Sequence, residues 1–421
     1  MNWTRSSFGT RTPPPLDLRR KRCALLLFAC VALPAHAQSL SVHGFADLRL
    51  VAPSDQRSWI DGGLGKTRYG DDSNVVEFGG AALVLDWQLA PAWLAHADVQ
   101  AHTDDDSSIE AMEAYLRFRP VSTTPWRWSA KAGEWFVPGS LENQGIGWTS
   151  LWTITPSAIN SWMGEEFRAI GAEARVEHRG ERSSWEGAFA VLRANDPAGD
   201  VLAARGWSFS DRTFGFGGEV REPDVSGFGA PPPIRADLFL EVDGRWGWYG
   251  ELTWHGASEQ RVTLVRYDNR ADPAASTEFD GRELYAWTTD YWSIGAQARI
   301  DRVTLIAQAM DGATDIAFGG GPLSTTEFRA AFLLAAFGDG EWQPAVRVDH
   351  FTTTESPPSE PNPRAERGNA FTAALNWRPR PWLRLTGEAL YVHSVRGQRR
   401  DEGLDAEQDE VQLQVMARFL F

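Results

Sequence analysis

The sequence predicts an all-β protein: a transmembrane antiparallel β-barrel of about sixteen strands, with long outer loops and short periplasmic turns. Three observations predict it. Apolar and polar residues alternate in many segments, those segments run to ten or more residues, and the connections between them are short and long in turn. Alternation is typical of a strand with two different faces, and about ten residues let a tilted strand cross a bilayer.

Composition excludes several other classes of protein. The chain has 421 residues, 41 Lys+Arg, 56 Asp+Glu and a formal net charge of −15, with 43% hydrophobic residues, 20 Trp and 2 Cys. This apolar content is too high for a disordered chain, and the acidic balance argues against a general nucleic-acid binder. Two cysteines cannot form a disulfide scaffold. The longest apolar run, 23–35, is shorter than the roughly 20 residues of a membrane-spanning helix.

Residues 1–37 are predicted to be a secretory signal peptide. A basic cluster, Arg19–Arg22, precedes the apolar run, and Ala35-His36-Ala37 supplies a small-x-small cleavage site. Cleavage there would leave 35 basic and 55 acidic residues in 38–421, which is a net charge of −20, and would remove both cysteines. We therefore expect an exported, cysteine-free barrel over 38–421.

Strands can be assigned along the rest of the chain from the alternation. In the last twelve residues, Val411, Leu413 and Val415 fall on one face and Gln412 and Gln414 on the other. The segments 109–119, 170–177, 292–300, 371–378 and 383–388 alternate in the same way. The predicted strands are 40–52, 74–89, 92–102, 107–119, 126–136, 168–178, 184–193, 247–256, 260–268, 287–300, 303–311, 327–337, 342–352, 367–378, 382–395 and 408–421.

An even number of strands places both termini at the periplasmic end and the long loops outside. The loop 194–246 could hold another hairpin, so eighteen strands is the alternative. Tryptophans near the predicted strand ends are expected to form girdles at the membrane–water boundaries, with sugar stacking as the alternative for some. They are Trp87, Trp93, Trp126, Trp128, Trp248, Trp254, Trp342, Trp377 and Trp382.

Two further features resemble the Gram-negative outer-membrane porins. The terminal Phe421, preceded by Phe419 on the same face, resembles the signal read by the outer-membrane assembly machinery. The stretch Lys131–Asn143 (KAGEWFVPGSLEN) resembles the segment that precedes the inward-folded third loop in phosphate-selective-type (OprO/OprP-like) and related putative porins, and 163–171 resembles the strand that follows that loop. Phosphate-selective members line the pore with lysines and arginines. This chain has only Lys66 and Lys131 after residue 37, so the resemblance does not extend to phosphate selectivity.

Charged residues of both signs are predicted to face the lumen. Arg117, Arg119, Arg127 and Lys131 lie on two adjacent strands, and the strand with Arg127 and Lys131 leads into the loop 137–167. We expect these four residues to form one side of a constriction. Cross-strand ion pairing that only stiffens the wall is the alternative. Loop 137–167 is too apolar to remain in water and is expected to fold into the barrel. The remaining candidate constriction residues are Glu113, Glu173, Arg175, Trp148 and Trp152.

Acidic residues concentrate in the outer loops, where divalent cations could bridge them to lipopolysaccharide. Asp104–Asp106 could bind Ca²⁺ through carboxylate oxygens, but a solvated acidic loop is the favoured explanation of the run. The stretch 62–67 only resembles a phosphate-binding loop, since Ile60 occupies the position of the first glycine, and 61–69 is expected to be an outer-loop turn. No nucleophile motif accompanies the eight histidines, so we expect no enzyme and no cofactor.

These features predict an outer-membrane porin-like channel for the passive diffusion of small hydrophilic solutes. The alternative is a barrel enzyme or a surface-binding barrel without an open pore. The expected partners are the lipid bilayer, lipopolysaccharide, the assembly machinery and the solutes themselves, with a homotrimer as one assembly to test. The expected location is the outer membrane of a Gram-negative bacterium.

Overall fold

The structure is a computed structural model that describes residues 39–71, 73, 75–104, 109–223, 235–279, 282–338 and 340–421. The predicted signal peptide, 1–37, lies outside the described residues.

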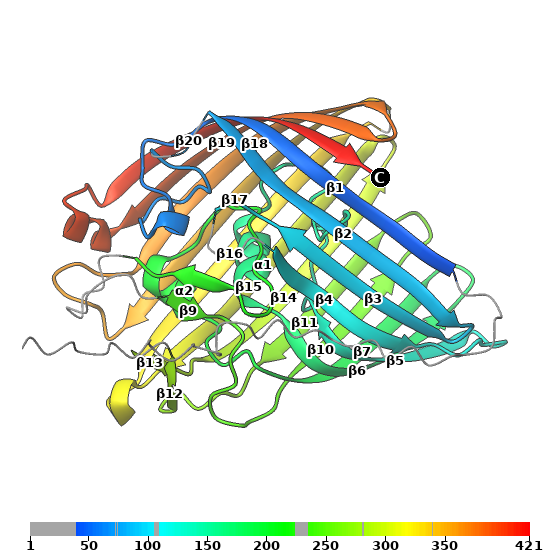
Figure 1. Cartoon of the computed structure of the whole chain (residues 1–421), viewed down its shortest axis with the longest axis horizontal. Coiled ribbons are helices and arrows are strands. Elements are labelled where there is room, and N and C mark those ends of the chain that lie inside the picture. The colour runs from blue at the N-terminus through cyan, green and yellow to red at the C-terminus, as the bar shows by residue number, and fades with distance from the viewer. Residues whose placement is uncertain are drawn as a thin grey trace, which may run out of the picture. The chain divides into compact units, whose positions relative to one another are not determined.

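Sixteen antiparallel strands form a closed barrel in which β1 pairs with β20 (Figure 1). This confirms the predicted fold and the count of sixteen over eighteen. Consecutive barrel strands are also neighbours in space. They are β1 (Ser39–Ala52), β2 (Val76–Ala90), β3 (Trp93–Ala101), β4 (Ile109–Phe118), β5 (Trp126–Trp135), β6 (Ala169–Arg179), β7 (Ser184–Arg193), β10 (Gly247–His255), β11 (Arg261–Asp268), β14 (Thr288–Ile300), β15 (Val303–Ile316), β16 (Ser324–Phe337), β17 (Trp342–Ser356), β18 (Glu366–Arg380), β19 (Leu383–Arg396) and β20 (Glu407–Leu420).

The long connections contain the other elements. The loop 194–246 holds the helix α2 (Asp200–Arg205) and a small hairpin of β8 (Glu219–Arg221) and β9 (Arg235–Asp237), which pairs outside the barrel sheet. A second hairpin, β12 (Ser276–Phe279) and β13 (Arg282–Tyr285), lies in the loop before β14. The helix α1 (Ala158–Glu166) lies between β5 and β6. Among the described residues, no helix is long and apolar enough to span a membrane.

Most barrel strands turn an apolar face outward and a more polar face inward, whereas the inner face of β16 carries Phe328, Phe332 and Leu334. In β20, Val411, Leu413 and Val415 are exposed, whereas Gln412 and Gln414 are buried. Side chains alternate because successive Cβ atoms of a strand point to opposite faces. A broad outward surface of aliphatic side chains suits lipid rather than water.

Aromatic side chains mark the turn end of this apolar surface. Trp93, Trp126, Trp342 and Trp382 are all exposed near the short turns, and Trp342 stacks on Trp377 at 5.2 Å. At the loop end the outward face becomes charged: Arg266 on β11 pairs with Asp290 on β14 at 2.6 Å, and Arg329 on β16 pairs with Asp311 on β15 at 2.5 Å. Charged groups avoid the hydrocarbon layer, so these pairs mark its outer limit.

One assignment of a residue to a face is wrong. The alternation placed Met112 on the lipid face with Ala114 and Leu116, but its side chain is fully buried. The pairing of β3 with β4 shifts register between Asp98 and Val99, and such a bulge turns the next side chain to the other face. The sulfur of Met112 accepts a hydrogen bond from Arg168 at 3.5 Å.

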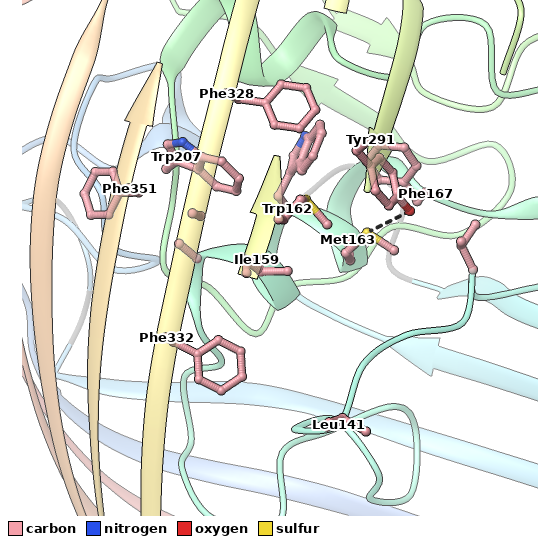
Figure 2. Close-up of a cluster of buried hydrophobic side chains, with 14 of the residues drawn as sticks. Leu141, Ile159, Trp162, Met163, Phe167, Trp207, Tyr291, Phe328, Phe332 and Phe351 are labelled. Carbon is pink, nitrogen blue, oxygen red and sulfur yellow. Dashed lines mark hydrogen bonds between the residues drawn. The ribbon is translucent and has the colours of Figure 1, made fainter. Parts of the chain in front are cut away.

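Apolar side chains of α1 pack inside the barrel against the inner faces of the strands (Figure 2). Trp162 meets Phe328 of β16 edge-on at 4.7 Å and Trp207 of the 194–246 loop at 5.5 Å. Phe167 packs against Tyr291 of β14 at 5.5 Å, and the hydroxyl of Tyr291 donates to the Met163 sulfur at 3.4 Å. Two long loops therefore share one apolar core within the barrel.

Candidate functional site

The charged side chains inside the barrel have two different surroundings. At the turn end of β4 to β7 they line a cavity. On β17 to β20 they are buried beneath the inward-folded loops.

The cavity measures about 770 Å³ and lies at the turn end of the barrel. The turns β6–β7 and β10–β11 contribute residues 180–183 and 256–257 to its rim. Seven of its lining side chains are basic and four are acidic. They are Arg117, Arg119, Arg127, Lys131, Arg175, Arg179 and Arg182, and Glu173, Glu177, Glu181 and Glu186.

Six of the nine residues expected at a constriction line this cavity: Arg117, Arg119, Arg127, Lys131, Glu173 and Arg175. They meet because β4, β5 and β6 pair in a register that places Arg117 opposite Lys131 and Lys131 opposite Glu173. Glu113 lies further toward the loop end, where its carboxylate is 3.5 Å from His96 and accepts the backbone N–H of Phe136 at 3.2 Å.

The two tryptophans expected at the constriction lie in the loop 137–167 and not on the cavity wall. Trp148 stacks on Phe136 at 4.3 Å with nearly parallel rings. The backbone carbonyl of Trp152 accepts from the Asn376 side chain on β18 at 2.8 Å. Both residues are partly buried against the apolar core inside the barrel.

Arg175 is the centre of the ion pairs in the cavity wall. It binds Glu173 at 3.2 Å and Glu251 at 2.8 Å, and it also contacts Glu186. Lys131 is 3.6 Å from Glu173, and its ammonium lies 4.4 Å from the centre of the Trp135 ring. These contacts fit the alternative of cross-strand pairing for part of the wall.

Arg117 and Arg127 differ from their neighbours. Neither forms an ion pair with another described residue, and the Nε of Arg117 has no hydrogen-bond partner there. Arginine is charged at any physiological pH. The cavity therefore presents two guanidinium groups that the wall itself does not neutralise by direct contact.

On the opposite wall, four buried carboxylates on consecutive strands bind backbone N–H groups of the inward-folded loops. Glu388 accepts from Ile154 at 2.5 Å and from Thr155 at 3.1 Å. The other three contacts are Asp349 with Ala158 N (3.3 Å), Glu366 with Trp207 N (2.9 Å) and Glu410 with Lys66 N (2.8 Å).

Arginines of the same wall bind the carbonyl groups of these loops. Arg347 donates to the carbonyl oxygens of Thr155 at 2.7 Å and Pro156 at 3.0 Å, and it pairs with Glu142 at 2.7 Å and Asp349 at 2.8 Å. Buried backbone groups need partners, and a loop inside a barrel has no regular sheet to provide them. The wall charges supply these hydrogen bonds.

The loops are also joined to one another. The carboxylate of Glu166, at the end of α1, accepts from the backbone N–H groups of Gly199, Val201 and Leu202 at 3.0 to 3.1 Å and from the Trp162 indole. Burial raises the pKa of Glu166 to about 7. This carboxylate therefore ties α1 to the first turn of α2.

The sequence did not indicate the inward position of the first loop. The stretch 61–69 was expected to be an outer-loop turn, but Lys66, Thr67 and Arg68 are buried. Lys66 contacts Glu366 of β18, and burial lowers its pKa to about 7. Arg68 binds Asp211 at 3.0 Å and Asp104 at 2.5 Å. In the sequence, the rarity of lysine singled out Lys66, but it could not identify Glu366 as the partner of Lys66.

A cation has one candidate set of ligands in the described part of the chain. Oxygens of Asp196, Glu241 and Asp243 lie within 4.8 Å of one another in the loop 194–246. Asp196 already accepts from the backbone N–H groups of Val242 at 2.5 Å and Asp243 at 3.2 Å, and burial raises its pKa to about 6. These contacts explain the cluster without an ion. In the run Asp104–Asp106, Asp104 pairs with Arg68, and the other two lie outside the described residues.

Comparison with known proteins gives a fold but no family. No family model matches the chain, and no curated protein matches it. A loop-deletion variant of OmpT, an outer membrane protein of Vibrio cholerae, is 9% identical and aligns over 92% of this chain and all of its own, with a TM-score of 0.53. An anion-selective porin from Comamonas acidovorans is 11% identical over 91% of this chain and all of its own, with a TM-score of 0.50. The chain thus shares the fold of outer-membrane β-barrel proteins.

Proposed function

We propose that this protein is an outer-membrane channel of porin type in a Gram-negative bacterium, through which small hydrophilic solutes diffuse passively. The charged cavity inside a closed barrel carries the proposal. An apolar outer face belongs in a bilayer, and a polar, hydrated inner wall is what a hydrophilic solute needs in order to cross it. The same fold occurs in an anion-selective porin.

The proposed solute path follows the inner face of β4 to β7. Charged side chains at the turn end of these strands line the cavity, whereas those of β17 to β20 are covered by the loops. The loop 137–167 narrows this path from the other side. Its resemblance to the third loop of phosphate-selective-type porins supports that role.

We further propose that the channel prefers anions over cations. Basic residues outnumber acidic ones around the cavity, and Arg117 and Arg127 have no ion-pair partner among the described residues. Phosphate selectivity is not part of the proposal, because Lys131 is the single lysine lining the cavity. The reversal potential of the R117E/R127E variant in a salt gradient should shift toward cation selectivity. An unchanged potential would refute the assignment of these residues to the path.

Conductance in planar bilayers tests the channel directly. The purified protein should form ion-conducting pores, and a variant that lacks 145–162 should conduct more per channel. If the deletion variant folds and its conductance equals that of the intact protein, the loop does not form the constriction. If neither protein conducts, the channel proposal is wrong.

A barrel that is closed at rest is the second candidate, and the packing of the loops favours it. Side chains of Trp162, Trp207 and Phe209 are fully buried within the barrel, as a stable plug would require. Such a protein would conduct only after the loops are displaced. A closed barrel would be identified if the wild-type protein does not conduct and the variant that lacks 145–162 does.

The remaining proposals concern assembly. Phe419 near the end of β20 and Phe421 directly after it are exposed, and we propose that they serve as the signal for the assembly machinery. OmpT of Vibrio cholerae has been described in a trimer form, and a homotrimer is proposed here on that analogy of fold. We assign the protein no enzymatic activity and no cofactor.

A further inference from the structure

Two arginines lie on the outward face of the barrel, just beyond its apolar surface. Arg329 on β16 and Arg367 on β18 are exposed, and both pair with Thr352 of the strand between them. Neighbouring strands are about 4.8 Å apart, so the two residues lie on the order of 10 Å from each other across β17.

The next row toward the turn end on β17 and β18 is polar. His350 and Asn369 face each other across β17 and β18, and the Nδ1 of His350 is 2.9 Å from the side-chain oxygen of Asn369. Both side chains are exposed. Together with Thr352 they provide hydrogen-bonding groups between and below the two arginines.

Below these residues the surface becomes fully apolar. Leu333, Val348 and Phe371 form the next outward row, and Val346 and Leu375 continue the apolar surface toward the turn end, all of them exposed. Acyl chains that lie on this surface would place their headgroup at the level of Arg329 and Arg367. From the turn end toward the loop end, this surface is first apolar, then carries hydroxyl and amide groups, and then guanidinium groups. A lipid with an anionic headgroup has the matching order, with its acyl chains against the apolar part and its headgroup at the arginines.

The arginines are available to such a headgroup. Arg329 pairs with Asp311, but both side chains are about two-thirds exposed, at 69% and 66%. Exposed pairs contribute little, so a ligand phosphate can replace the aspartate. Arg367 forms no ion pair with another described residue. Planar guanidinium groups bind phosphate oxygens through paired hydrogen bonds.

We propose that the outward face of β16 to β18 binds the phosphorylated headgroup of an outer-leaflet glycolipid of the lipid A type, with Arg329 and Arg367 contacting its phosphates. This rests on the proposed location in the outer membrane. It moves the lipopolysaccharide contact from the acidic loops, where the sequence predicted it, to the barrel wall.

Native mass spectrometry of the detergent-purified protein tests the site. The probes are bisphosphorylated lipid A, its dephosphorylated form and phosphatidylglycerol. Wild type should retain bisphosphorylated lipid A, and the R329Q/R367Q variant should bind it about tenfold more weakly, as expected when charge-assisted hydrogen bonds are lost. The matched control is R266Q, which removes another outward arginine at the loop end, paired with Asp290 on β14.

Three results would overturn the inference. They are equal retention of dephosphorylated lipid A, retention by R329Q/R367Q that equals wild type, and an equal loss in R266Q. Phosphatidylglycerol bound as tightly as lipid A at the same arginines would replace the glycolipid with phospholipids in general. Conductance of the same preparations in bilayers without lipid A tests the channel separately, so a failure of one proposal is distinguishable from a failure of the other.

Discussion

Replacing Arg347 with glutamine should release the loop 137–167 from the barrel wall. Arg347 is fully buried on β17 and holds the loop through Glu142 and through the carbonyl groups of Thr155 and Pro156. Glutamine is neutral and too short to reach all of these groups. The substitution would leave the carboxylates of Glu142 and Asp349 buried without their cation.

The expected effect follows from the cost of an unpaired buried charge. Removing one partner of a buried ion pair costs about 3–5 kcal/mol. At about 1.4 kcal/mol for each tenfold change, the ratio of docked to undocked loop would fall by roughly 100- to 4000-fold. The barrel should persist, because its sixteen strands are joined by their own ladders of backbone hydrogen bonds.

Single-channel conductance and limited proteolysis measure this release. R347Q should conduct more than wild type and should be cleaved faster within 137–167. The double variant R347Q/E142Q should recover part of the protection, since it removes both charges of the pair. R299Q is the control, because Arg299 lies at the turn end of β14, where it pairs with the exposed Glu259 at 3.6 Å. Wild-type conductance and protection in a folded R347Q would refute the reasoning.

Three other substitutions probe the core, the loop contact and the C-terminus. W162A removes the ring between Phe167, Trp207 and Phe328 and should destabilise the docked state of the two loops by about 3–5 kcal/mol. The loops of W162A should therefore be cleaved faster by protease than those of the control W382A. Because the pKa of Glu166 is raised to about 7, the docked state holds more protons than the undocked state between pH ~4.5 and 7. The contact between α1 and residues 199–202 should therefore weaken as pH rises through that window in wild type but not in E166Q. Hydrogen exchange at residues 199–202 measures this change. F421A should reduce the folded barrel recovered from outer membranes, measured by heat-modifiable gel mobility, whereas F337A should not.

The strands could be predicted because their signal is local. In β20 the alternation of Val411, Leu413 and Val415 with glutamines specifies both the element and its faces, and no distant contact changes it. Each predicted barrel strand has its counterpart in the structure, and the bounds differ mainly where a strand continues past the bilayer, as β15 does to Ile316. Met112 was misplaced because a bulge between paired strands leaves no trace in the sequence of one strand.

The partners of the inner charges could not be predicted in the same way. Alternation placed Glu388 and Glu410 on the lumen side, but it could not show that loop residues more than 200 positions away would occupy that lumen. Lys66 appeared to belong to an exposed turn, because its buried environment is formed by β18, β20 and the loop 194–246. Only the register of the whole barrel brings these segments together.

The different lengths of the strands explain why the two walls have different uses. β14 to β20 have 13 to 15 residues, whereas β3 to β7 have 9 to 11. A longer strand offers more inward positions, and on β17 to β20 these hold the carboxylates and arginines that bind the folded loops. On the shorter wall, Glu110 of β4 also binds the loop 194–246, through the backbone N–H of Gly215 at 2.6 Å and through Arg212. The charges at the turn end of that wall remain at the cavity. The proposed solute path therefore follows β4–β7, and substitutions on β17–β20 should change conductance only through the loops they hold.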